Sequence, residues 1–147
     1  MLGYLNLPDA TAKAIEKDGW LHTGDVGYMD EDGFIFLVDR VKDMIISSGE
    51  NVYPREIEEV VSAYPGVAEC SVIGIPDALR GQAICLYVVP REGETIDKKA
   101  LRQYLIGRIA PYKVPREYFL VESLPKTALG KVRKNVLRDE TVAIVSQ

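Results

Sequence analysis

The fold of this chain is decided by residues 67–89, VAECSVIGIPDALRGQAICLYVV. Two apolar runs, Val67–Ile75 and Gln82–Val89, flank the loop Pro76–Gly81, which contains proline, aspartate and glycine. Runs of this length that are rich in β-branched residues and bounded by turn residues predict strands. The stretch therefore predicts two neighbouring strands joined by a short loop.

Helical patterns lie on both sides of these strands. Pro54 suits the first turn of a helix, and apolar residues follow it at helical spacing. Asp97 has the side chain of an N-cap for a second helix with one apolar stripe. A last helix is expected from Asn135 to about Val145. The two stripes are Ile57, Val60, Val61 and Tyr64, and Leu101, Tyr104, Leu105 and Ile109.

The remaining β-rich segments predict one more strand and two hairpins. Tyr118–Val121 predicts the third strand of a sheet. Met44–Tyr53 predicts a hairpin that turns at Ser47–Glu50, and Gly27–Leu37 predicts another around an acidic turn that ends in glycine. Strands and helices segregate along the chain, so we expect an α+β fold: a small domain with a three-stranded sheet covered by helices plus a β-hairpin, preceded by a β-rich tail.

The composition excludes several classes of protein. The formal net charge is −4 over 147 residues, which gives no general attraction to nucleic acid. No apolar run approaches the roughly 18 residues that a transmembrane segment needs, and the first residues lack a signal-peptide pattern. Cys70 and Cys85 lie in apolar runs, so we expect buried thiols in a reducing compartment. These features predict a cytoplasmic protein.

A lysine follows a glycine in the segment Leu124–Lys134, LPKTALGKVRK. Glycine lets backbone approach an anion, and the Lys131 side chain supplies a mobile positive charge. A P-loop needs glycine five residues before the Gly-Lys pair and Ser or Thr after it, whereas this chain has Pro125 and Val132. Other groups must therefore hold most of any nucleotide that Lys131 meets.

Two further segments precede this one at wide spacing: Gly19–Gly27, GWLHTGDVG, and Asp39–Asp43, DRVKD. The three together resemble the adenylate-forming superfamily, which includes acyl-CoA synthetases, peptide-synthetase adenylation domains and luciferase-type enzymes. The resemblance runs from about Gly3 to Arg138. Within the superfamily, Gly49–Glu58 is most similar to fatty acyl-CoA ligases.

The resemblance implies roles in nucleotide chemistry for three residues. Lys131 is expected to be catalytic, because its ammonium would offset the negative charge that grows on the ATP α-phosphate. Asp25 is expected to accept hydrogen bonds from the two ribose hydroxyls. Arg40 is expected to contact the nucleotide with its planar donor fork. The alternatives are a solvated loop lysine, a turn-capping aspartate, and an ion pair of Arg40 with Asp39 or Asp43.

The resemblance also implies a hinge and a second functional face. Lys42 is expected to be the hinge between two domains, residues 1–41 at the end of a large N-terminal domain and 42–147 forming a mobile C-terminal lid. Ser48, Gly49 and Glu50, with Ser47, are expected to form the loop along which coenzyme A passes. A plain linker lysine and an ordinary hairpin turn are the alternatives.

The implied protein is an ATP-dependent acyl-CoA synthetase that converts a carboxylic acid, expected to be a fatty acid, to acyl-AMP and transfers it to CoA. ATP, CoA and Mg²⁺ are the expected cofactors, held mainly by the N-terminal domain, and no metal ligand is expected in this chain. The chain is then a C-terminal fragment, inactive alone, whose partner is that domain; a homo-oligomer is compatible. The alternatives are a non-catalytic module that binds CoA or a partner, and an adenylation enzyme that loads a carrier protein.

Four basic residues around Lys131 leave two interpretations open. They form either a solvated basic face or a patch for the 3′-phosphate of CoA. These residues are Lys126, Arg133, Lys134 and Arg138.

Overall fold

The computed structural model describes residues 1–145, with the side chain of residue 145 left undescribed. It divides the chain into two compact units, Met1–Lys42 and a second that begins at Asp43. The division falls within one residue of the expected boundary at residues 41 and 42.

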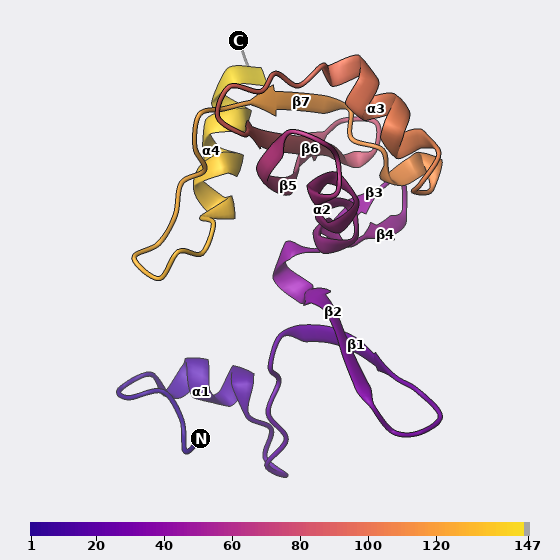
Figure 1. Cartoon of the computed structure of the whole chain (residues 1–147). Helices are drawn as coiled ribbons and strands as arrows, with labels where there is room; N and C mark the ends of the chain where they lie inside the picture. Colours follow the sequence, from indigo (N-terminus) through magenta and orange to yellow (C-terminus); the bar gives the residue numbers. More distant parts are fainter. Residues whose placement is uncertain (146–147) are drawn as a thin grey trace. The chain divides into compact units, whose positions relative to one another are not determined.

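The first unit, Met1–Lys42, contains one short helix and one hairpin. The helix α1, Pro8–Ala14, begins with a proline. Strands β1, Asp25–Met29, and β2, Ile35–Arg40, pair antiparallel with an irregularity after Val26 (Figure 1). No residue of this unit is buried.

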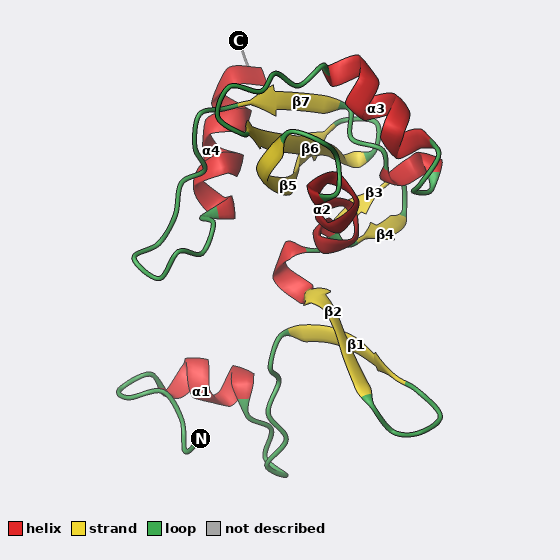
Figure 2. Cartoon of the chain, viewed as in Figure 1, coloured by secondary structure: helices red, strands yellow, loops and turns green. Residues whose placement is uncertain are grey.

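The second unit alternates strands and helices and contains both apolar cores. Figure 2 shows its strands in yellow and its helices in red. Its elements begin after the short 3-10 helix η1, Val41–Asp43, and are β3, Ile45–Ser47; β4, Glu50–Val52; α2, Pro54–Ser62; β5, Val67–Asp77; β6, Gly81–Pro90; α3, Lys98–Ile106; η2, Pro111–Lys113; β7, Glu117–Leu120; and α4, Lys134–Val145.

Strand β6 lies at the centre of the sheet. It pairs antiparallel with β5 over nearly its whole length and parallel with β7. These are the three strands that the sequence predicts. The hairpin β3–β4 joins the same sheet through one pair, Ser47 with Gly81, so the sheet has five strands in the described part of the chain.

Each face of the sheet carries its own apolar core. Val72, Leu86 and Tyr118 point to one face, where residues of α2 and α3 pack against them. Their neighbours Ile73 and Cys85 point to the other face and pack with Leu137 of α4. This period-2 alternation produces three layers, with two helices on one face and one on the other. The predicted α+β class is confirmed.

Local sequence explains where the helices begin. Pro54 opens α2, and the predicted stripe residues Ile57 and Val61 are fully buried. The Asp97 carboxylate accepts a hydrogen bond from the Lys99 N–H at 2.9 Å, as expected for an N-cap.

Candidate functional site

In the first unit, Asp25 and Arg40 form an ion pair. They are register partners across β1 and β2, and Arg40 Nε lies 3.0 Å from Asp25 Oδ1. The Asp25 side chain is 27% exposed and the Arg40 side chain 56% exposed. A carboxylate and a guanidinium thus stand together at one end of the hairpin, with room for a polar ligand to approach both.

The turn before β1 fixes the direction of this carboxylate. Gly24 has a φ of +75°, a left-handed conformation that glycine adopts without strain. The Asp25 N–H donates to Thr23 Oγ1 at 3.1 Å, and the Val41 N–H donates to the Gly24 carbonyl at 2.9 Å. The backbone at the start of β1 and directly after the end of β2 is therefore hydrogen-bonded to this turn.

The alternatives considered for Arg40 were ion pairs with Asp39 or Asp43. Asp43 pairs instead with Arg138, whose Nη2 lies 3.2 Å from Asp43 Oδ1. Asp39 accepts a hydrogen bond from the backbone N–H of Arg40 at 2.7 Å. The guanidinium itself pairs with Asp25, so the two residues that the sequence analysis treated separately are direct neighbours.

Lys42 lies in the short 3-10 helix Val41–Asp43 and is the last residue of the first unit. Its side chain is exposed. The division between the two compact units follows this residue, and its role as a hinge stays a prediction.

In the second unit, Ser48 and Gly49 form a two-residue turn between β3 and β4. Their φ angles are +55° and +84°, so both central residues are left-handed, as in a type I′ hairpin. Ser47 pairs with Glu50 across the turn, and the Ser48 N–H donates to the Arg80 carbonyl at 2.9 Å. The turn is thereby attached to the loop before β6.

Gly49 is needed for its backbone conformation. A Cβ built at Gly49 would meet no other atom of the described chain within 4 Å. Its positive φ accounts for the glycine without any ligand. Glu50 is exposed beside it, and the passage of CoA along this loop stays a prediction.

Gln82 is a residue that the sequence analysis left without a role. Its Oε1 accepts a hydrogen bond from the Ile46 N–H at 2.7 Å, which ties β3 to the start of β6. In the adjoining loop, hydrogen bonds from the Leu79 and Arg80 N–H groups lower the pKa of the Asp77 carboxyl. Nothing local in the sequence pairs Gln82 with a residue 36 positions earlier.

Lys131 lies on a closely bonded loop. Its N–H donates to Thr127 Oγ1 at 3.2 Å, and its carbonyl accepts from the Thr127 N–H at 2.8 Å. The Gly130 N–H donates to the Thr127 carbonyl at 2.9 Å with a φ of +79° at Gly130. Within residues 1–145, the Lys131 ammonium has no hydrogen-bond or ion-pair partner. Hydrogen bonds therefore hold the backbone of Lys131, while its ammonium has no partner within these residues.

Three of the four basic residues around Lys131 are engaged in ion pairs. Lys126 Nζ lies 2.7 Å from Glu69 Oε1, and Lys134 Nζ lies 2.8 Å from Glu58 Oε1. Arg138 pairs with Asp43, as described above. Lys126 stays exposed, while Lys134 and Arg138 are half-buried in their ion pairs, so the solvated face and the patch for the CoA 3′-phosphate both stay predictions. Arg133 is exposed.

The described residues offer no metal cluster and no membrane span. They contain no group of three or more His, Cys, Asp or Glu side chains that could hold a metal ion. No helix in the described chain is long and apolar enough to cross a bilayer.

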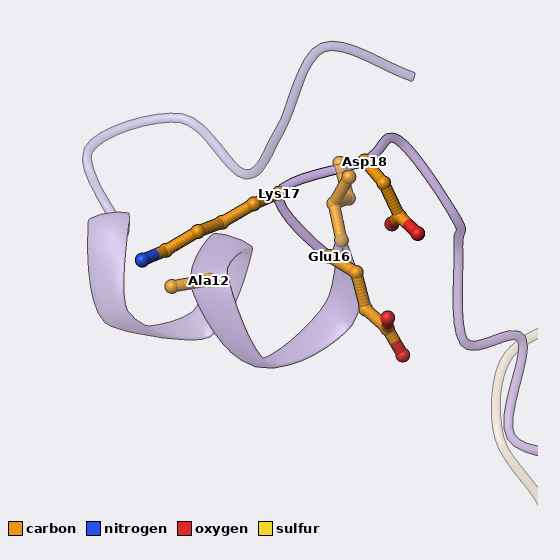
Figure 3. A pocket seen from close by; sticks show the side chains of 5 residues that line it. Ala12, Glu16, Lys17 and Asp18 are labelled. Atoms are coloured by element: carbon orange, nitrogen blue, oxygen red, sulfur yellow. The ribbon is translucent and has the colours of Figure 1, made fainter.

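A hollow beside the end of α1 is unrelated to the predicted site. Figure 3 shows the Lys17 side chain extending back across Ala12, while the Glu16 and Asp18 carboxylates point away from it. Glu16 Oε1 also lies 2.6 Å from His22 Nε2. None of these residues belongs to the predicted site.

Residues 56–131 match the model of the AMP-binding enzyme C-terminal domain. The chain belongs to this family. The match covers α2 from its third residue, the whole of β5, β6, α3 and β7, and the loop up to Lys131, so the resemblance noted from the sequence motifs is confirmed.

Relatives of known name are similar to nearly all of this chain. The 3-[(3aS,4S,7aS)-7a-methyl-1,5-dioxo-octahydro-1H-inden-4-yl]propanoyl:CoA ligase of Rhodococcus jostii (strain RHA1) is 50% identical over 140 residues, which are 95% of this chain and 27% of the ligase. The long-chain-fatty-acid–CoA ligase of Bacillus subtilis (strain 168) is 47% identical over 142 residues, 96% of this chain and 25% of the ligase. The chain thus spans about a quarter of the length of these relatives.

A solved structure has the same arrangement of elements. The crystal structure of ATP-bound MatB from Rhodopseudomonas palustris superimposes with a TM-score of 0.90 at 41% identity, over 97% of this chain and 28% of that protein. The family's fold and that of this chain therefore agree.

Proposed function

We propose that this chain is the lid portion of an ATP-dependent acyl-CoA synthetase and that Lys131 acts in its adenylation step. One observation carries the proposal: the backbone of Lys131 is bonded to Thr127 on both sides, while its ammonium has no partner among the described residues. An unpaired ammonium on a fixed backbone can stabilise negative charge that develops only in the transition state.

The proposed reaction has two steps. A carboxylate oxygen attacks the ATP α-phosphorus, pyrophosphate leaves, and an acyl-adenylate forms. The CoA thiol then attacks the acyl carbon, loses its proton and displaces AMP. In the first step two anions approach each other and negative charge grows on the phosphoryl oxygens, so the Lys131 ammonium lowers the barrier.

Asp25 and Arg40 are proposed to bind the nucleotide. The Asp25 carboxylate can accept hydrogen bonds from both ribose hydroxyls, and Arg40 supplies donors 3.0 Å away for a phosphate or ribose oxygen. The pair is partly exposed, so it can exchange its mutual contact for a ligand at little cost.

The hairpin turn Ser48–Gly49 with Glu50 is proposed to line the path of CoA, and Lys42 to be the hinge between the steps. Mg²⁺ is proposed to be held outside this chain, since its described residues offer no cluster of ligands. A fatty acid is the proposed substrate class. Support comes from the Bacillus subtilis relative, although the Rhodococcus jostii relative is named for a ring-containing acid.

The first unit is proposed to be the end of a larger domain. None of its residues is buried, and large apolar side chains such as Trp20, Phe34 and Ile35 are 66–73% exposed. A two-stranded hairpin is marginal alone in water. We therefore expect the chain by itself to release no pyrophosphate from ATP and a fatty acid; release by the purified chain would contradict this part of the proposal.

A chimera tests the whole proposal. This chain replaces the matching segment of the Bacillus subtilis ligase, and acid-dependent release of pyrophosphate from ATP is measured. Lys131→Ala should slow this step by at least ~10²–10³-fold, as loss of an oxyanion donor does. Lys98→Ala, which removes an exposed lysine from α3, is the matched control.

The second half-reaction separates chemistry from folding. With acyl-adenylate supplied ready-made, the Lys131→Ala chimera should form acyl-CoA at close to the unsubstituted rate. Pyrophosphate release that survives Lys131→Ala would overturn the proposed role of Lys131.

A further inference from the structure

Glu58 connects three elements of the second unit. Its carboxylate Oε1 accepts hydrogen bonds from the Val72 N–H of β5 and from Lys134 Nζ at the start of α4, both at 2.8 Å. Glu58 itself lies in α2. The side chains of the Glu58–Lys134 pair are only 22% and 18% exposed. This carboxylate therefore has a fixed position, and the Lys134 ammonium is drawn to it.

The Glu58–Lys134 pair lies at the C-terminal end of the Lys131 loop. Lys134 is the first residue of α4 and follows Lys131 by three positions. At the N-terminal end of the loop, Lys126 forms an ion pair with Glu69 of β5. Lys126 also forms an isolated antiparallel β-bridge with Val132. The Lys126–Glu69 pair is about twice as exposed, at 39% and 43%, so it constrains the loop less.

The start of α4 needs a carboxylate for an electrostatic reason. A helix has a partial positive charge at its N-terminus, which disfavours a cation in the first turn. Lys134 places a cation at that end. Glu58 offsets both charges, so its carboxylate holds the beginning of α4 beside Val72 of β5.

We propose that Glu58 is a positioning residue for Lys131: its ion pair with Lys134 fixes the exit of the loop and thereby the location of the Lys131 ammonium. The inference rests on the proposed adenylation role of Lys131. A displacement of about 1 Å in a reacting geometry can slow a reaction by about 10²-fold. Glu58 thus acts on the chemistry without touching the substrate.

The structure offers a substitution that removes the charge from this one contact. Glu58→Gln keeps an oxygen that can accept the Val72 N–H but loses the negative charge opposite Lys134. The helix backbone at Glu58 is held separately, since its carbonyl accepts from Ser62 Oγ at 2.7 Å and Cys70 Sγ at 3.4 Å. Glu59→Gln is the matched control, because Glu59 is exposed and pairs with Arg55 one turn earlier on the same helix.

The chimera described above measures the effect on each half-reaction. Glu58→Gln should slow adenylation roughly 10-fold or more while thioester formation from supplied acyl-adenylate stays near the unsubstituted rate. Lys134→Gln should do the same, and the double variant should be little slower than either single variant, because one interaction is lost in all three. Equal slowing of both half-reactions, or no slowing beyond that of Glu59→Gln, would overturn the inference.

A second measurement needs no activity. In the chain itself, hydrogen exchange of the amides in residues 127–133 should speed up in Glu58→Gln and stay unchanged in Glu59→Gln. Exchange in the β3–β4 hairpin should not change in either variant. Unchanged exchange in the loop would count against the positioning role even if the chimera were inactive.

The two proposals fail in different ways. If Lys131→Ala retains adenylation, the proposed function is wrong. If Lys131→Ala abolishes adenylation while Glu58→Gln and Lys134→Gln behave like Glu59→Gln, only the positioning role is wrong.

Discussion

The Asp25 carboxylate lies 3.0 Å from the Arg40 guanidinium, and the two residues are partners across β1 and β2. Fifteen positions separate them in the sequence, and the hairpin turn brings them together. Since the Arg40 side chain is more than half exposed, the pair contributes little to stability. The pair is therefore free to serve the nucleotide-binding role proposed for it.

Asp25→Asn should weaken the use of ATP. The amide loses one of two acceptor oxygens and its negative charge, and hydrogen bonds to charged groups contribute about 1.5–3 kcal/mol. We expect the KM for ATP in the chimera to rise by about 10-fold or more. Asp32→Asn, in the exposed turn between β1 and β2, serves as the control. A KM for ATP that does not move would argue against ribose binding at Asp25.

Thr127→Val should slow adenylation through the backbone of Lys131. The hydroxyl that accepts the Lys131 N–H at 3.2 Å is lost, while the bond from the Thr127 N–H to the Lys131 carbonyl remains. A net hydrogen bond of about 1 kcal/mol corresponds to a roughly five-fold slower rate. Thr127→Ser keeps the hydroxyl and should retain the rate. Pyrophosphate release is the measurement, and equal rates for the Val and Ser variants would contradict the prediction.

Local patterns allowed the elements of the second unit to be predicted from the sequence. Pro54 opens α2 and Asp97 caps α3 because these effects act within one helical turn. The Leu124–Lys134 segment also identified the Lys131 loop by itself.

Contacts between distant segments could not be predicted in the same way. Glu58 and Lys134 are 76 positions apart, and Gln82 bonds to Ile46 across 36. The sequence next to each of these residues is the same whether or not its distant partner is present, so it does not reveal the contact. The sequence predicted the β3–β4 hairpin but not that it joins the sheet, because β3 pairs with β6 through only one residue pair, Ser47 with Gly81.

The stability of the chain should fall as the pH rises above about 9. Burial raises the pKa of the Cys85 thiol from 9.0 to about 12 and that of Tyr118 from 10.0 to about 12. Between these pKa values both groups are neutral in the folded chain and ionised in the unfolded chain. Their contribution to stability is therefore complete below the pKa of the unfolded state and is lost as the pH rises toward the pKa of the folded state. Each group can lower the free energy of unfolding by up to about 1.4 kcal/mol per pH unit within its window.

Tyr118→Phe isolates one of these groups. The Tyr118 hydroxyl is buried without a hydrogen-bond partner in the described chain, so its removal should cost no stability at pH 7. Urea unfolding between pH 8 and 11 should give a shallower loss of stability above about pH 10 for Tyr118→Phe than for the unsubstituted chain. Identical pH dependence would show that Tyr118 ionises in the fold as it does in the unfolded chain.

Lys42→Pro should separate the two half-reactions. A residue in a 3-10 helix has a φ near −60°, close to the value that a proline ring imposes. A proline ring at position 42 fixes φ and so prevents the rotation that a hinge requires. We expect the Lys42→Pro chimera to keep one half-reaction and to slow the other by at least about 10²-fold, because only one lid orientation remains productive. Lys42→Ala, which removes the ammonium but leaves φ free, should keep both. Pyrophosphate release and thioester formation from supplied acyl-adenylate are measured in parallel, and parallel slowing of both by Lys42→Pro would exclude the hinge role.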